Sequence, residues 1–123
     1  MISKTGADLR LRKDRQIRFV LENGFLFRGK HIILRALPAN KINPPLEGPG
    51  PFLAIVISRK KEKKAVWRNW MKRRLREIFR LQRTEIPHGK AYVAVARAID
   101  KKATYLDLEQ DFMNLIAKSK ETK

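Results

Sequence analysis

The chain has 123 residues, which is enough for one domain with a single hydrophobic core. Hydrophobic residues make up 43% of it, which excludes a disordered polycation, and the lack of cysteine excludes a disulfide scaffold, a thiol nucleophile and a cysteine-ligated zinc site. Its 29 Lys and Arg residues against 12 Asp and Glu give a net charge of +17, so we expect a polyanionic partner.

The sequence contains no apolar run of about 18 residues, the length that a membrane-spanning helix needs. Residues 1–18 are polar and lack the apolar stretch of a signal peptide. We therefore expect a cytoplasmic protein without a membrane partner, organised as one domain over residues 1–123.

The chain begins with a polar, basic segment without periodicity, and we expect residues 1–13 to form an arm. The basic residues of this arm nearest the domain are Arg10, Arg12 and Lys13. Asp14 predicts the N-cap of a first helix, which Asn23-Gly24 ends. The apolar stripe of this helix consists of Ile17, Val20 and Leu21.

Residues that favour β-structure follow. A short strand is predicted to begin with Phe25 and Phe27, and two more strands are predicted over residues 31–37 and 91–96. The apolar run 52–57 predicts a strand buried on both faces. Residues 38–51 hold five of the six prolines and two glycines, which predicts a loop.

A last helix is predicted after Thr104, which can act as its N-cap with Asp107 in a shortened capping box. The apolar face of this helix consists of Leu108, Phe112, Leu115 and Ile116. The predicted order is one helix, two or three strands, a helix, a strand and a helix, which is typical of an α+β domain.

Most of the charge lies in one segment. Residues 58–83 hold twelve basic and two acidic residues, a net charge of +10. From Ala65 to Arg83 there is no Gly or Pro, which predicts a helix. At about 100° per residue its core side gathers Trp67, Met71, Leu75 and Ile78.

The opposite side of this helix is basic. Like charges spaced four residues apart destabilise a helix, so we expect them to contact phosphates. The stripe consists of Arg68, Lys72, Arg76 and Arg80, with Asn69 and Arg73 beside it. A merely solvated helix face and a helix lying on an anionic membrane are the alternatives, and both are less favoured.

Other candidate chemistry is weak. His31 and His88 are isolated in sequence. The carboxylates Asp107, Glu109 and Asp111 fit the dipole of the last helix better than a metal site. We therefore expect no metal, no cofactor and no catalytic residue in the protein. Trp67 is expected in the core, whereas Trp70 is either partly buried or an exposed platform for a base or ribose.

The segment from Ser58 to Glu77 resembles the signature of the bacterial ribonuclease P protein subunit. That family has a strand ending in Ser-x-Lys, followed by a helix with Arg-Asn-Arg-x-x-Lys-Arg-x-x-Arg-Glu. The resemblance extends over roughly residues 10–118, through the helix before Gly24, the strand that ends at Arg97 and the Thr-Tyr-x-x-Leu start of the last helix.

The resemblance implies an αβββαβα two-layer sandwich with a left-handed β-α-β crossover, similar to the second domain of a small-subunit ribosomal protein. It implies the protein component of an endoribonuclease that removes the 5′ leader of precursor tRNA, in which the RNA subunit performs hydrolysis with Mg²⁺. The implied partners are the ribonuclease P RNA, in a one-to-one complex with a protein monomer, and precursor tRNA. A basic RNA-binding protein without this enzyme, such as a ribosomal protein or an RNA chaperone, is the alternative.

Residue by residue, the resemblance assigns RNA contacts to one helix and one strand end. They fall on Ser58, Arg59, Lys60, Arg68, Asn69, Lys72, Arg73 and Arg76, and Arg80 extends the same face. The leader cleft falls on Ile17, Leu21 and Arg35, where the family carries aromatic residues. Trp70 replaces the second Arg of Arg-Asn-Arg, and Lys63-Lys64 replaces a Gly-Asn pair, with about one extra residue in the connection.

Overall fold

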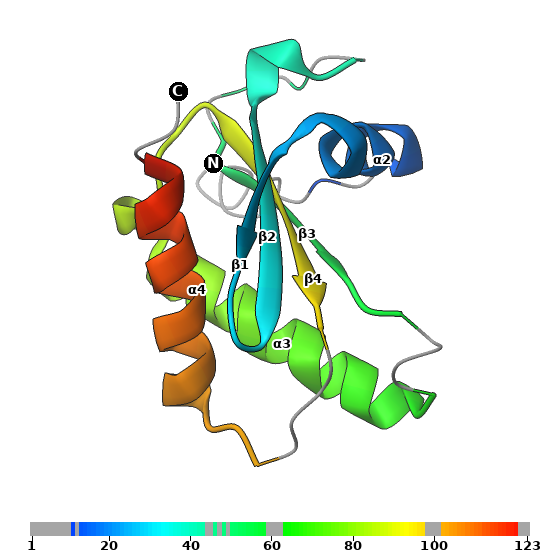
Figure 1. Cartoon of the computed structure of the whole chain (residues 1–123), viewed down its shortest axis with the longest axis vertical. Helices are drawn as coiled ribbons and strands as arrows, with labels where there is room; N and C mark the ends of the chain where they lie inside the picture. The colour runs from blue at the N-terminus through cyan, green and yellow to red at the C-terminus, as the bar shows by residue number, and fades with distance from the viewer. Residues whose placement is uncertain are drawn as a thin grey trace, which may run out of the picture.

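The computed structural model describes residues 11, 13–43, 46, 48, 50–58, 63–97 and 102–120. Their elements are α2 (Asp14–Asn23), β1 (Phe25–Arg28), β2 (Ile32–Pro38), η1 (Ala39–Lys41), β3 (Phe52–Val56), α3 (Ala65–Leu81), η2 (Arg83–Glu85), β4 (Lys90–Ala96) and α4 (Tyr105–Lys120). The two η elements are single 3₁₀ turns, and the remaining elements confirm the predicted α+β class and αβββαβα order (Figure 1).

The four strands form one mixed sheet in the order β1-β2-β4-β3. β2 pairs antiparallel with β1 and with β4, whereas β3 runs parallel to β4. A parallel pair requires a crossover connection, and α3 provides it between β3 and β4.

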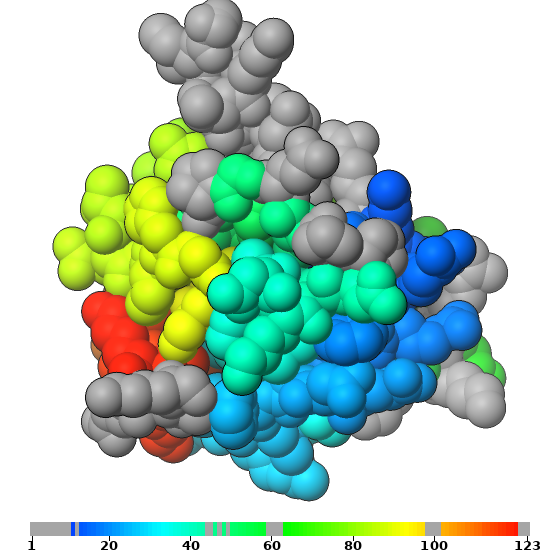
Figure 2. Space-filling model, turned by 90° about the horizontal axis from the view of Figure 1, so that it is seen from above, coloured from blue at the N-terminus to red at the C-terminus, as the bar shows by residue number. Residues whose placement is uncertain are grey.

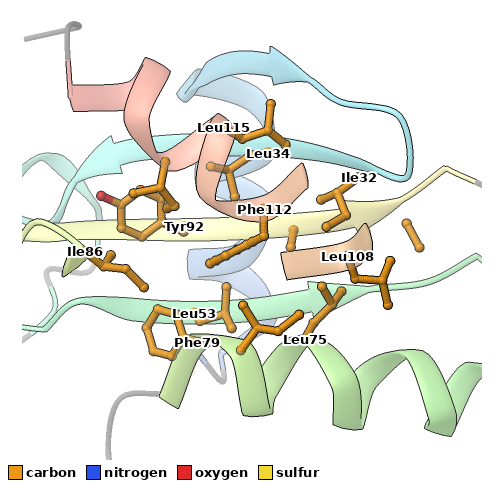
Figure 3. Close-up of a cluster of buried hydrophobic side chains, with 14 of the residues drawn as sticks. Ile32, Leu34, Leu53, Leu75, Phe79, Ile86, Tyr92, Leu108, Phe112 and Leu115 are labelled. Carbon is orange, nitrogen blue, oxygen red and sulfur yellow. The ribbon is translucent and has the colours of Figure 1, made fainter. Parts of the chain in front are cut away.

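One face of the sheet packs against α3 and α4. Figure 3 shows side chains from β2, β3 and β4 meeting those of both helices, with Phe112 and Tyr92 at the centre. Burial raises the pKa of the Tyr92 hydroxyl to about 12. The residues of this cluster that are exposed by 1% or less are Ile32, Leu34, Met71, Leu75, Ile78, Ile86, Tyr92, Ala94, Leu108, Phe112, Leu115 and Ile116.

The other face of the sheet packs against α2, which Figure 2 shows in blue beside the cyan end of β2. Val20 is fully buried there, whereas Ile17 and Leu21 are half-buried at the edge of the cluster. The sheet and loop residues beneath α2 include Leu37, Ala39, Phe52, Ala54, Ala91 and Val93. The sheet therefore has a core on each face, and the prediction that β3 is buried on both faces is confirmed at its first three residues.

The prediction that Asp14 caps α2 is wrong. The N-cap residue is Lys13, no side chain caps this end, and Asp14 is already in the first helical turn. The other end is as predicted: the helix ends at Asn23, and the amide of Gly24 donates to the carbonyl of Val20. A Cβ at Gly24 would lie 2.7 Å from that carbonyl oxygen, so the close approach of backbone to backbone requires glycine.

The capping box predicted for α4 is confirmed. The amide of Thr104 donates to Asp107 Oδ2 at 2.9 Å, and the amide of Asp107 donates to Thr104 Oγ1 at 3.1 Å. The backbone hydrogen bond from Thr104 is the main cause that lowers the pKa of Asp107.

Asp111 does not serve the helix dipole as expected. It lies beyond the first turn of α4. Its buried carboxylate accepts hydrogen bonds from the backbone amides of Lys30, His31 and Ile32 at 2.8–3.1 Å. Lys30 and His31 lie in the turn between β1 and β2, and Ile32 begins β2. In the same turn a Cβ at Gly29 would collide with this carboxylate. A single side chain of α4 thus fixes the hairpin turn.

Candidate nucleic-acid interface

The basic side predicted for α3 lies at the surface of the protein. Asn69, Arg73, Arg76 and Arg80 are exposed, and Arg68 and Lys72 are half-buried. The apolar back of the helix closes the core through Met71, Leu75, Ile78 and Phe79. The helical spacing did not predict that Phe79 is a core residue, and it is buried beside the basic side. The basic stripe therefore flanks the buried face of α3 and is not strictly opposite to it.

Arg68 and Arg80 of the basic side bond to neighbouring groups of the protein itself. Arg68 Nη1 donates to the carbonyl of Lys63 at 2.8 Å, which fixes the chain that enters α3. Arg80 Nη2 lies 2.7 Å from Glu77 Oε2 in an exposed ion pair, and the hydrogen bond to Glu77 raises the pKa of Arg80. Arg80 therefore presents a partly neutralised charge within a helix side that is basic as a whole.

The start of α3 adds to the positive charge of this side. Lys64 is the N-cap residue, no side chain caps this end, and no acidic residue lies in the first turn. The positive end of the helix dipole therefore meets Lys63 and Lys64, and both are exposed. Ser58 follows β3 and is half-buried, whereas the predicted contacts Arg59 and Lys60 lie outside the described residues.

The residues assigned to the leader cleft come together on the other side of the sheet. Arg35 is half-buried in β2, opposite Val93 in β4, and alternation places it on the face that carries α2. Its Nη1 donates to the carbonyl of Gly24 at 3.3 Å, at the end of α2. With Ile17 and Leu21 half-buried along α2, the site combines apolar side chains and one cation.

Leu11, near the end of the predicted arm, is bound to the sheet. Leu11 is buried, and its amide donates to the carbonyl of Leu53 in β3 at 2.9 Å. Lys13 is exposed at the start of α2, whereas Arg10 and Arg12 lie outside the described residues.

The two tryptophans of α3 contact each other at the edge of the core. Trp67 and Trp70 are both half-buried, so Trp67 is not the core residue that we expected. Their rings meet edge to face, with centroids 5.9 Å apart and planes at 78°. The guanidinium of Arg74 lies 5.2 Å from the centroid of the Trp70 ring. Trp70 is thus partly buried and is also available at the surface.

The described part of the chain contains no group of three or more His, Cys, Asp or Glu residues placed to hold a metal ion. None of the helices within the described ranges is long and apolar enough to cross a membrane.

The comparisons with known proteins agree with the resemblance. Residues 6–120 match the family model described as Ribonuclease P. The chain is 32% identical to the ribonuclease P protein component of Pseudanabaena sp. over 111 residues, which cover 90% of each chain. It is 33% identical to that of Clostridioides difficile over 110 residues, which cover 89% of this chain and 90% of that protein.

Solved structures share the fold. A ribonuclease P protein mutant from Staphylococcus aureus, described as defective in mRNA degradation, superposes with a TM-score of 0.80 at 22% identity, covering 97% of this chain and 94% of that one. The Thermotoga maritima ribonuclease P protein gives a TM-score of 0.73 at 25% identity, covering 89% and 96%. With its basic helix, its sheet order and these relatives, the chain belongs to the ribonuclease P protein family.

Proposed function

We propose that this chain binds ribonuclease P RNA through the basic side of α3 and assists removal of the 5′ leader from precursor tRNA. The observation that carries the proposal is the division of α3 into two sides. Its apolar side closes the core of the sheet, so the stripe from Arg68 to Arg76 is held rigidly toward a partner. Phosphate recognition by Arg and Lys needs such fixed, like-signed groups.

We place the 5′ leader along α2 and the sheet face beside it. Ile17, Leu21 and Arg35 are half-buried there, which leaves part of each side chain for a ligand. The aliphatic side chains offer apolar contact in place of stacking, and Arg35 offers a charge to a phosphate. This arrangement favours contact with a single strand whatever its sequence.

Hydrolysis belongs, in this proposal, to the RNA subunit and its Mg²⁺ ions. The protein contributes positive charge near the junction of RNA subunit and substrate, which lowers the Mg²⁺ concentration needed to bring two polyanions together. We propose one protein monomer for each RNA in a cytoplasmic particle.

Reconstitution tests the proposal. The cognate RNA is assayed for cleavage of precursor tRNA over a series of Mg²⁺ concentrations, with and without the protein. We expect the protein to shift the cleavage curve to lower Mg²⁺. Identical curves would contradict the proposal.

A second measurement separates this function from that of a general RNA-binding protein. The affinities of the reconstituted particle for precursor tRNA and for mature tRNA are compared. Leader contact predicts tighter binding of the precursor, and this preference should weaken in the variant Arg35→Gln. Equal affinities for both tRNAs would favour a ribosomal protein or an RNA chaperone.

A further inference from the structure

A pocket of about 340 Å³ lies on α3 next to the basic stripe. It is lined by Trp70, Arg73, Arg74 and Glu77 of α3 and by Tyr105 at the start of α4. Figure 1 shows how α4 approaches α3 in this part of the molecule. Arg73 belongs both to this pocket and to the predicted RNA contacts, so the pocket is continuous with the proposed RNA-binding surface.

The pocket offers a flat platform that is already in place. The edge-to-face contact with Trp67 orients the Trp70 ring, and the Arg74 guanidinium lies over the ring. Aromatic rings, such as indoles, and guanidinium planes are the side-chain surfaces on which unpaired RNA bases stack. Trp70, which could act as a platform for a base, therefore lies in a pocket that can hold one.

The polar groups of the pocket fit the rest of a nucleotide. Arg73 is exposed and can bind a phosphate. The Glu77 carboxylate pairs with Arg80, and its remaining lone pairs can accept hydrogen bonds from base amino or imino groups. The Tyr105 hydroxyl is buried and has no hydrogen-bond partner within the part of the chain that the structure describes. Burial, with Glu109 and Glu77 adding to it, raises the pKa of this hydroxyl, so it stays protonated.

Other occupants fit less well. Three of the five lining residues carry a charge, and two of these are cations, which disfavours an apolar protein segment. A small inorganic anion would use the arginines and leave the indole without a role. The volume is at the lower end for small-molecule sites, as a single nucleotide requires.

We propose that this pocket receives one unpaired nucleotide of the ribonuclease P RNA, with its base stacked on Trp70 and Arg74 and its phosphate on Arg73. The inference rests on the proposed function, because the RNA subunit supplies the nucleotide. It adds a point contact with a base to a surface otherwise built for phosphates.

The test compares Trp70→Leu, which keeps apolar bulk and removes the ring stack, with the wild-type protein in binding to the cognate RNA transcript. We expect about 5- to 150-fold weaker binding at unchanged salt dependence, because a base stack is lost and no phosphate contact is. Trp70→Phe should restore most of the affinity. The matched control is Val66→Ala, one turn earlier on α3, 66% exposed and outside the pocket lining, which should bind as the wild type does.

Chemical probing of the same complex gives the decisive readout. One unpaired nucleotide should be protected by the wild-type protein and by Val66→Ala, and should become reactive with Trp70→Leu. Should Trp70→Leu fail to fold, Trp67→Phe leaves Trp70 as the single tryptophan, and its emission should be quenched when the RNA binds.

The outcomes separate the two proposals. If the wild-type protein does not bind the transcript, the proposed function itself fails. If it binds, and Trp70→Leu binds equally well with the same protections, the pocket proposal alone is overturned. Unchanged Trp70 emission in the RNA complex of Trp67→Phe would overturn it as well.

Discussion

Lys72 is the residue that best tests the phosphate contacts of α3. It is half-buried and lies one helical turn from both Arg68 and Arg76. We expect Lys72→Ala to weaken binding of the cognate RNA and to reduce the slope of log affinity against log salt concentration by roughly one unit.

The matched control for this prediction is Lys118→Ala, an exposed lysine in the last turn of α4. It removes the same charge from the molecule and should leave the slope unchanged. An unchanged slope for Lys72→Ala would mean that this side chain does not touch a phosphate.

Asp111 shows at the same scale how one buried carboxylate can fix a turn. Replacing it with Asn keeps the volume but exchanges one of the two accepting oxygens for an NH2 group, which cannot accept from the three inward-pointing N–H groups. We expect Asp111→Asn to lower the free energy of unfolding by about 3 kcal/mol. Urea unfolding measures this, with the exposed neighbour Asn114→Ala as control, and a loss no larger than that of the control would contradict the assigned role.

The helix α2 divides, like α3, into a side for the core and a side for a ligand. Val20 is fully buried under α2, whereas Ile17 is half-buried at its edge. We expect Val20→Ala to cost about 2 kcal/mol of unfolding free energy and Ile17→Ala about 1 kcal/mol.

The effects of the two variants on tRNA binding should be reversed: the variant that costs less stability should change binding more. Ile17→Ala should reduce the preference of the reconstituted particle for precursor over mature tRNA, and Val20→Ala should leave it unchanged. If Ile17→Ala costs as much stability as Val20→Ala and leaves the preference intact, then Ile17 is a core residue and the leader does not pass there.

The local pattern of the sequence predicted most elements to within one or two residues. The order of α3, β4 and α4 and the capping box at Thr104 depend only on neighbours in sequence, so they are readable from it. Asp14 was misread because a capping residue and a first-turn acidic residue look alike when the backbone angles of Lys13 are unknown. Asp111 was misread because its partners are 79 to 81 residues away.

The whole molecule must fold against its own charge. A net charge of +17 on 123 residues repels itself, and the ion pair of Glu77 with Arg80 is exposed. Salt screens this repulsion, with a Debye length of about 10 Å at 0.1 M.

We therefore expect the melting temperature of the isolated protein to rise by about 3–6 °C between low salt and physiological ionic strength, which corresponds to about 1 kcal/mol. Differential scanning calorimetry in sodium chloride measures it. A melting temperature that stays constant or falls would mean that the basic surfaces do not oppose folding.

By itself the sequence determined the elements, the basic side of α3 and, through the resemblance, the family. Each of these depends on periodicity and spacing along one stretch of chain. Tertiary structure decided which side chains from distant stretches meet: Asp111 with the hairpin turn, Arg35 with the end of α2, and Tyr105 with Trp70 across the pocket. Such contacts are fixed by how α2, α3 and α4 pack on the sheet, and no local pattern encodes that packing.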